Sequence, residues 1–307
     1  MAVAASLPVV LVPVGTDDEA LDACLAALEV GTPAGTRVWL ADNIHAGPRG
    51  LELIRRWLDD TALQADFSRR RQRVGEAAHL AEMIAACGDA DVIVLAPDTV
   101  PAPGWFDQLV ACLAHDAAIG SASTWCNAGE TASWPRVGDV NAVPERLPDV
   151  ARAAAALPRV YPELPNAVAH AVILRGSARR RAGALDGESY GSWYASLVDY
   201  SLRLAGLGWR NALCANAFVA RVHEAGPAEG DNDVLAVRWP GWHKRLADFL
   251  MHDPLRSLRQ DLQRRVQEEA RDGAQQELFR QATASTVADG NPGVPVEAGQ
   301  VNGQAGS

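Results

Sequence analysis

Residues 7–113 alternate between short apolar stretches of strand length and stretches with helical periodicity, and this alternation limits the possible folds more than any other feature. The predicted strands are 7–14, 37–41 and 91–95, and the predicted helices are 20–28, 51–57, 73–86 and 105–113. Strands that are separated by helices form a parallel sheet with helices on both faces. The predicted fold class is therefore α/β, with a mostly parallel sheet flanked by helices.

Polar residues follow each predicted strand, at the edge where sheets of this kind bind ligands. They are residues 15–18, then Asp42 and Asn43, then Asp98 and Thr99. A carboxylate at this edge can hold Mg²⁺ or Mn²⁺, with water or phosphate in the remaining positions. Pro-Asp-Thr is also a favourable turn sequence. The residues alone leave both roles open for Asp98.

The charge and cysteine content exclude several classes of protein. A net charge of −10 disfavours a nucleic-acid-binding function, because such proteins neutralise phosphates with a cationic face. Arginines cluster at 69–73 and 179–181, where they either contact phosphate or form solvated helix ends. The five cysteines are far apart and form no CxxC pair, which disfavours a zinc knuckle or a disulfide framework and fits a reducing compartment.

Several sequence motifs are missing. The chain contains no GxGxxG, no GxxxxGK[ST] and no GxSxG, so neither a dinucleotide fingerprint, a P-loop nor a nucleophile elbow is predicted. It has no signal-peptide pattern, and no stretch approaches the roughly 20 apolar residues of a membrane span. A cytoplasmic protein is predicted, and peripheral attachment to the inner face of the membrane is left open.

The second half of the chain has a weaker pattern. Residues 120–165 are rich in Pro and Gly and predict a loop-rich excursion, followed by strands at 167–174 and 212–222 and a helix at 199–207. Residues 246–282 are charged and helical, with spaced leucines that predict a C-terminal helical appendage packed on the domain or on a partner. The tail at 283–307 is predicted to be disordered.

Four blocks carry a resemblance to a known family. They are VVLVPV at 9–14, LADN at 40–43, VIVLAPDTVPAPGWFDQLV at 92–110 and DYSLRLAGLGWRNALCANAFVARVHEAG at 199–226. In this order and spacing the chain resembles a family 2 glycosyltransferase of the GT-A fold, most closely the bacterial rhamnosyltransferase-like and O-antigen-type enzymes. The resemblance covers residues 7–226 and implies a GT-A domain over residues 1–245.

The resemblance implies a sugar transfer from a nucleotide-sugar donor to a saccharide or lipid-linked acceptor in cell-surface polysaccharide biosynthesis. Pro13 and Val14 fall beside the base pocket of the family, and Asp42 falls on the acid that contacts the nucleoside. Asp98 falls on the acid that binds the donor diphosphate through a divalent metal, Mg²⁺ or Mn²⁺, and His223 falls on a histidine that completes this metal site. Residues 246–282 are predicted to contact a protein partner or a membrane surface.

The chain departs from the family at three places. It reads Ala81-Glu82-Met83 where a helix of the family usually carries Asn-x-Gly. Ala96 replaces the first polar residue of the metal motif, and the block that supplies the general base reads ASLVD at 195–199, where one acid remains. The predicted base is Asp199 or an acid of the 183–191 loop, Glu188 or Asp186, unless the local alignment slips. Asp199 could instead cap a helix. The alternative function is a catalytically silent GT-A domain that acts as a binding or scaffold partner of an active transferase.

Overall fold

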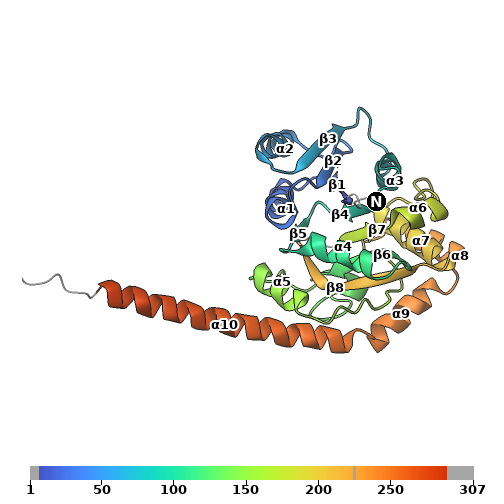
Figure 1. Cartoon of the computed structure of the whole chain (residues 1–307). Coiled ribbons are helices and arrows are strands. Elements are labelled where there is room, and N and C mark those ends of the chain that lie inside the picture. The colour runs from blue at the N-terminus through green and yellow to red at the C-terminus, as the bar shows by residue number, and fades with distance from the viewer. Residues whose placement is uncertain (1–6, 224–225, 289–307) are drawn as a thin grey trace, which may run out of the picture. The chain divides into compact units, whose positions relative to one another are not determined.

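The computed structural model describes residues 7–223 and 226–288 (Figure 1). Its strands are β1 (Val9–Val14), β2 (Arg37–Asp42), β3 (Gln64–Arg69), β4 (Val92–Leu95), β5 (Thr99–Pro101), β6 (Ile119–Trp125), β7 (Ala171–Leu174) and β8 (Arg210–Arg221). Its helices are α1 (Asp18–Gly31), α2 (Pro48–Asp60), α3 (Glu76–Ala86), α4 (Trp105–His115), η1 (Glu130–Ala132), α5 (Leu147–Ala155), α6 (Gly176–Ala182), α7 (Trp193–Gly206), α8 (Asp231–Arg238), α9 (Trp242–His252) and α10 (Arg256–Ala288).

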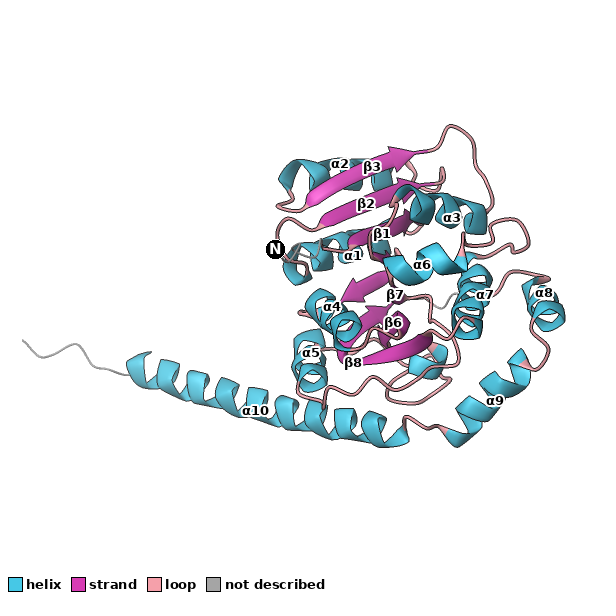
Figure 2. Ribbon diagram, turned by 45° about the vertical axis from the view of Figure 1, so that its right-hand side comes forward, coloured by secondary structure: helices cyan, strands magenta, loops and turns pink. Residues whose placement is uncertain are grey.

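The described strands form one sheet in the order β3-β2-β1-β4-β7-β6-β8-β5 (Figure 2). The first four strands of this order, β3 to β4, are parallel to one another, and β6 is parallel to β8. β7 is antiparallel to both β4 and β6, and β5 is antiparallel to β8. The predicted α/β class with a mostly parallel sheet is confirmed. The carboxyl ends of β1, β2 and β4 therefore meet at one edge.

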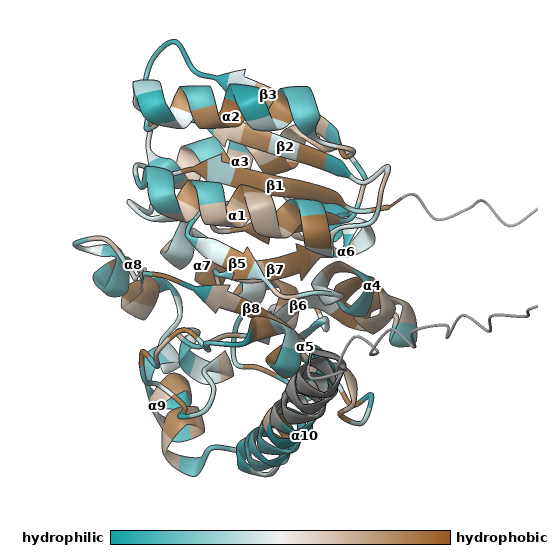
Figure 3. Cartoon of the chain, turned by 90° about the vertical axis from the view of Figure 1, so that its left-hand side faces the viewer, coloured by the Kyte–Doolittle hydropathy of each residue, from teal (hydrophilic) through white to brown (hydrophobic). Residues whose placement is uncertain are grey.

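Both faces of the sheet are covered, which explains the continuous apolar runs of its central strands. Along β1, Val10 and Val12 pack with Leu25 of α1 on one face, and Leu11 packs with Leu80 of α3 on the other. This alternation follows from the two-residue period of a strand. Figure 3 shows hydrophobic strands between helices whose outer surfaces are hydrophilic.

Several elements differ from the sequence prediction. The stretch 120–165, predicted to be loop-rich, contains most of β6 and all of α5. β3 was not predicted, because it lies at the edge of the sheet and its sequence QADFSR is mostly polar and exposed. α7 begins at Trp193 with Ser192 as its N-cap, so the predicted capping role of Asp199, which lies inside the helix, is wrong. The single helix predicted over 246–282 is two helices, because Asp253 adopts a positive φ of 41° and Pro254 follows it.

A third apolar cluster covers the outer part of β8. Phe218 of β8 and Trp125 of β6 pack there with Leu255 and with Leu262 of α10. The described residues up to Val266 form one compact unit, and the described residues from Gln267 onward belong to a second. α10 continues to Ala288, and the rest of the predicted disordered tail lies outside the described residues. None of the described helices has both the length and the apolarity to cross a membrane.

Candidate functional site

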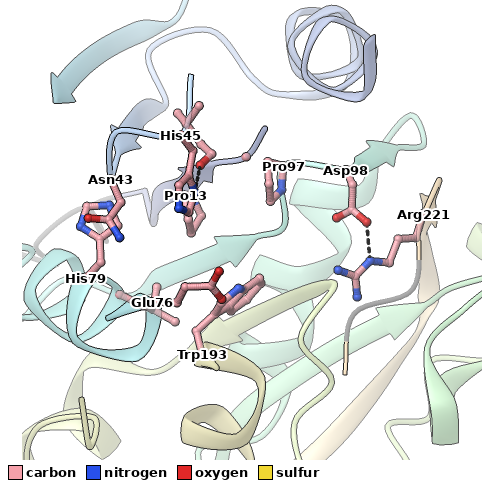
Figure 4. Close-up of a pocket in the computed structure, with 12 residues that line it drawn as sticks. Pro13, Asn43, His45, Glu76, His79, Pro97, Asp98, Trp193 and Arg221 are labelled. Carbon is pink, nitrogen blue, oxygen red and sulfur yellow. Dashed lines mark hydrogen bonds and ion pairs between the residues drawn. The ribbon is translucent and has the colours of Figure 1, made fainter. Parts of the chain in front are cut away.

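A cavity of about 210 Å³ opens at the carboxyl ends of β1, β2 and β4 (Figure 4). Its floor is the end of β1, where Pro13, Val14 and Gly15 line it. A side chain at Gly15 would place its Cβ 3.1 Å from Pro97 Cγ, so the glycine permits the close approach of two loops. Pro13 and Val14, which the sequence assigns to a base pocket, therefore do face a cavity. Their role in nucleotide binding stays a prediction.

Asp42 is fully buried and does not line the cavity. Its Oδ1 accepts hydrogen bonds from the backbone N–H of His45 (2.7 Å) and Ala46 (3.2 Å), and its Oδ2 pairs with Arg69 at 2.8 Å. These bonds fold the loop after β2 so that Asn43 and His45 reach the cavity. Asp42 therefore shapes the cavity wall through its neighbours, and the predicted nucleoside contact is untested.

The helical wall of the cavity was not predicted from the sequence. It includes Glu76 and His79 of α3 and Trp193 at the start of α7. His79 Nδ1 accepts a hydrogen bond from Arg70 Nε (3.0 Å), so its Nε2 carries the proton and donates to the carbonyl of Ala41 (3.2 Å). Burial lowers the pKa of His79, which favours this neutral form.

Asp98 lines the cavity next to Arg221, the last residue of β8. Arg221 Nε donates to Asp98 Oδ2 at 2.8 Å, and only 5% of the arginine side chain and 13% of the aspartate side chain are exposed. Asp98 Oδ1 is buried, and no hydrogen bond from a described residue reaches it. The sequence therefore located the carboxylate, and the fold adds an arginine from a distant strand.

His223 does not line the cavity. Its Nε2 lies 2.7 Å from Oδ2 of Asp17, the residue that caps α1, and its side chain is 56% exposed. The backbone of the preceding residue nevertheless lies close to Asp98, because Val222 N–H donates to the Asp98 carbonyl at 2.9 Å. The backbones at the two predicted metal ligands are thus hydrogen-bonded, and their side chains are held by different partners, Arg221 and Asp17.

A divalent metal needs several oxygen or nitrogen ligands directed at one point. Within residues 7–223 and 226–288, no group of three or more His, Cys, Asp or Glu side chains could hold a metal. Asp98 directs one oxygen at Arg221 and buries the other, and the guanidinium would repel a second cation beside it. The described residues, as arranged, do not fit Mg²⁺ or Mn²⁺. The predicted metal roles of Asp98 and His223 remain untested.

The predicted base candidates lie away from the cavity lining. Asp199 is fully buried, and its carboxylate accepts hydrogen bonds from four side chains: Tyr190 (3.2 Å), Arg203 (3.0 Å), Arg238 (3.2 Å) and Trp239 (2.9 Å). Glu188 is exposed on the loop before α7.

Asp186 accepts backbone hydrogen bonds from Glu188 and Ser189 and pairs with Arg238 at 2.7 Å. These donors lower the pKa of Asp186 well below its usual range, against a burial effect that raises it. Asp186 and Asp199 are thus held by structural partners, and the catalytic roles of all three acids stay predictions.

Glu130 is an acid that the sequence prediction overlooked. It follows β6, adopts a positive φ of 47°, and accepts a hydrogen bond from the hydroxyl of Tyr194. Non-glycine residues with positive φ are uncommon and concentrate at functional sites. Its partner Tyr194 follows Trp193 in α7, so Glu130 bonds to the residue next to one that lines the cavity.

Comparisons with known proteins identify the fold. No protein-family model and no curated protein matches the sequence. GalNAc-T7, in a crystal structure with UDP, GalNAc and Mn²⁺, superposes with a TM-score of 0.57 and 13% identity over 84% of this chain and 54% of that chain. The chain therefore spans about half the length of GalNAc-T7.

Two further solved structures superpose at similar levels. The mannosyltransferase PcManGT from Pyrobaculum calidifontis, in complex with GDP-Man and Mn²⁺, gives a TM-score of 0.51 and 14% identity over 93% of this chain and 81% of that chain. TarS 1–349 from S. aureus gives a TM-score of 0.51 and 12% identity over 70% of this chain and 60% of that chain. Identities this low establish the fold alone, and the predicted GT-A fold is confirmed.

Proposed function

We propose that this chain is a glycosyltransferase that moves a sugar from a nucleotide-sugar donor to a saccharide or lipid-linked acceptor in cell-surface polysaccharide biosynthesis. The observation that carries the proposal is the cavity at the carboxyl ends of β1, β2 and β4, in a GT-A fold, with Pro13, Val14 and Asp98 in its lining. Sheets of this type bind ligands at that edge. Two solved structures of similar fold hold such ligands: GalNAc-T7 with UDP, GalNAc and Mn²⁺, and the mannosyltransferase PcManGT with GDP-Man and Mn²⁺.

The proposed reaction sets two chemical demands. The acceptor oxygen forms a bond to the anomeric carbon while the bond to the donor phosphate breaks, so the leaving nucleoside diphosphate gains negative charge that a cation must stabilise. The acceptor hydroxyl also loses a proton, which a general base must accept. The proposal contains no step through a metal ion, because the described side chains do not fit one.

The proposal is tested by binding and turnover with the full chain. Isothermal titration calorimetry with UDP, GDP and dTDP, each in EDTA and in excess Mn²⁺ or Mg²⁺, measures whether a nucleoside diphosphate binds. Donor hydrolysis with the matching nucleotide sugars measures activation of the anomeric carbon. We expect at least one nucleotide to bind and its sugar to be released. Absence of binding in every condition would overturn the proposal.

A substitution locates the binding site. Trp193→Ala removes a large side chain from the cavity wall and is expected to weaken nucleotide binding, whereas Trp57→Ala on α2, away from the cavity lining, is the matched control. Equal affinities for the two variants would place the nucleotide elsewhere.

A second candidate function is a catalytically silent GT-A domain that binds or scaffolds an active transferase. Its support is that Asp199, the remaining acid of the base block, is fully buried and bonded to four side chains. A silent domain gives no donor hydrolysis, and Asp98→Ala then has no effect on any turnover. Measurable hydrolysis that Asp98→Ala abolishes would exclude it. A partner or membrane contact through residues 246–282 stays part of this candidate.

A further inference from the structure

Arg221 is a buried cation at the cavity, and both its backbone and its side chain are held in place. Its N–H donates to Asn127 Oδ1 (2.7 Å), and its carbonyl accepts from Asn127 Nδ2 (2.9 Å). Its Nε donates to Asp98 Oδ2. The two bonds to Asn127 fix the backbone of Arg221, and the bond to Asp98 orients its guanidinium before any ligand arrives, which lowers the entropic cost of binding a ligand.

The terminal nitrogens of Arg221, Nη1 and Nη2, are available to donate hydrogen bonds to a ligand. Within the described residues, neither Nη1 nor Nη2 donates a hydrogen bond, and neither is a buried atom without a partner. Arg221 lines the cavity, and Figure 4 shows its guanidinium beside Asp98 with its terminal nitrogens away from the carboxylate. Two parallel N–H groups with a permanent positive charge match the geometry of phosphate oxygens.

A second observation concerns Asp98, the partner of Arg221 in this ion pair. Asp98 buries Oδ1 without a hydrogen bond and commits Oδ2 to Arg221, so its carboxylate orients the arginine and offers no free oxygen to the cavity. Ala96, two residues earlier, supplies no ligand. Among the described lining residues, which also include the acid Glu76, Arg221 is the one Lys or Arg side chain that can meet a diphosphate.

We propose that Arg221 binds the diphosphate of the donor directly, with Asp98 as its positioning residue, so that nucleotide binding needs no divalent metal. This inference rests on the proposed function and specifies how the site recognises its ligand. It gives Arg221 the charge-neutralising role that the sequence resemblance assigns to Mg²⁺ or Mn²⁺.

The test is calorimetry with the nucleoside diphosphate that binds best, the matching nucleoside monophosphate and the nucleoside alone, in EDTA and in excess Mn²⁺. We expect the wild-type chain to bind the diphosphate with the same affinity, within about threefold, in both buffers. We expect Arg221→Gln to weaken diphosphate binding roughly ten- to hundredfold, as loss of a charged hydrogen bond does, and to leave nucleoside binding unchanged.

Matched variants separate recognition from folding. Arg259→Gln breaks another buried Arg–Asp pair, with Asp253, whose arginine side chain is also 5% exposed and which does not line this cavity. Its diphosphate affinity should match the wild type. Arg221→Lys keeps the positive charge and loses the paired N–H donors of the guanidinium. Its loss of diphosphate affinity should therefore be smaller than that of Arg221→Gln. Circular dichroism confirms that each variant is folded.

The role of Asp98 has its own readout. Asp98→Asn keeps an oxygen that accepts from Arg221 Nε, so it should retain more diphosphate affinity than Asp98→Ala, in EDTA as in Mn²⁺. If Asp98 were a metal ligand, both variants would lose the metal-dependent affinity together.

The possible results are distinguishable. Diphosphate binding that EDTA abolishes and Mn²⁺ restores would overturn this inference and leave the proposed transferase intact. No nucleotide binding in any buffer would overturn both. An Arg221→Gln variant that is folded and binds the diphosphate as the wild type does would overturn the inference alone.

Discussion

His170 shows how burial fixes the protonation state of a single residue near the site. It is fully buried next to β7, and its Nε2 lies 3.0 Å from the hydroxyl of Thr124. Burial, and then the nearby charge of Arg221, lower the pKa of His170 to about 3. The ring is therefore neutral at physiological pH, and Arg221 keeps the positive charge in this part of the domain.

The neutral state of His170 predicts a pH-dependent stability. The unfolded chain takes up a proton at His170 near pH 6.5, whereas the folded chain does so near pH 3. The stabilisation is therefore complete above about pH 6.5 and is lost as the pH falls from there towards 3. Between pH 7 and pH 5 this group alone should lower the free energy of unfolding by about 2 kcal/mol.

Urea denaturation at the two pH values checks this expectation. His170→Gln should lose about 2 kcal/mol less than the wild type between pH 7 and pH 5. His252→Gln, an exposed histidine on α9, should keep the wild-type dependence. An unchanged pH dependence in His170→Gln would contradict the assignment.

Asp199 is expected to act in stability. Asp199→Asn removes the charge that two arginines and two ring donors share, and should lower the free energy of unfolding by about 3 kcal/mol. Asp248→Asn, an exposed acid paired with Lys244, is the control. A general base would give the reverse result, with normal stability and a kcat lower by roughly 10²- to 10⁴-fold. Urea denaturation and donor hydrolysis, measured on one preparation of Asp199→Asn, distinguish a structural role from a general-base role.

Residue roles were partly predictable from the sequence. Asp98 follows an apolar strand, and the edge rule for parallel sheets finds it without a structure. Arg221 pairs with it from 123 positions away, so the contact exists only in the fold. The same rule applied to the end of the strand predicted at 212–222 would have indicated Arg221. Asp42 and Asp199 also fit sequence patterns, but burial gives their carboxylates other partners.

At the scale of elements, the start of α7 depends on one acid of α8. Asp231 is 2% exposed, and it accepts hydrogen bonds from the backbone N–H groups of Gly191 (2.7 Å), Ser192 (3.1 Å) and Ala228 (2.8 Å). The hydroxyl of Ser192 donates to it as well (2.5 Å). Asp231 thereby holds the residues immediately before Trp193, which lines the cavity.

This arrangement predicts a coupled effect of Asp231→Ala. Leaving several buried donors without an acceptor should lower the free energy of unfolding by about 3 kcal/mol. Nucleotide affinity should also fall, because Trp193 loses its anchor. Asp233→Ala, on the exposed side of the same helix, should change neither quantity. Wild-type affinity in a folded Asp231→Ala variant would show that Asp231 does not position the cavity wall.

Strands were predictable from the sequence where both of their faces are buried. β1 and β4 are buried on both faces, so their sequences are continuous apolar runs that a window search detects. β3 pairs on one side only, and its QADFSR sequence carries charges that an edge strand tolerates. The break between α9 and α10 was readable in principle, since Pro254 interrupts the helical pattern.

At the scale of the whole molecule, the first part of α10 belongs to the core of the domain. Leu255 and Leu262 are 1% and 0% exposed, and they pack with Phe218 and Trp125 over β8. β8 also carries Arg221 at its end, so the surface that α10 covers belongs to the strand that delivers a cation to the cavity.

Leu262→Ala tests this integration. Truncating a fully buried leucine leaves a cavity and should lower the free energy of unfolding by about 2–5 kcal/mol. If the start of α10 is part of one cooperative domain, thermal unfolding followed by circular dichroism and by loss of nucleotide binding should give one coincident transition, shifted to lower temperature. Val237→Ala, at a position 82% exposed on α8, should leave both curves unchanged. Separate transitions in Leu262→Ala would show that this segment unfolds independently of the nucleotide site, because a helix docked on a finished domain can detach without disturbing β8.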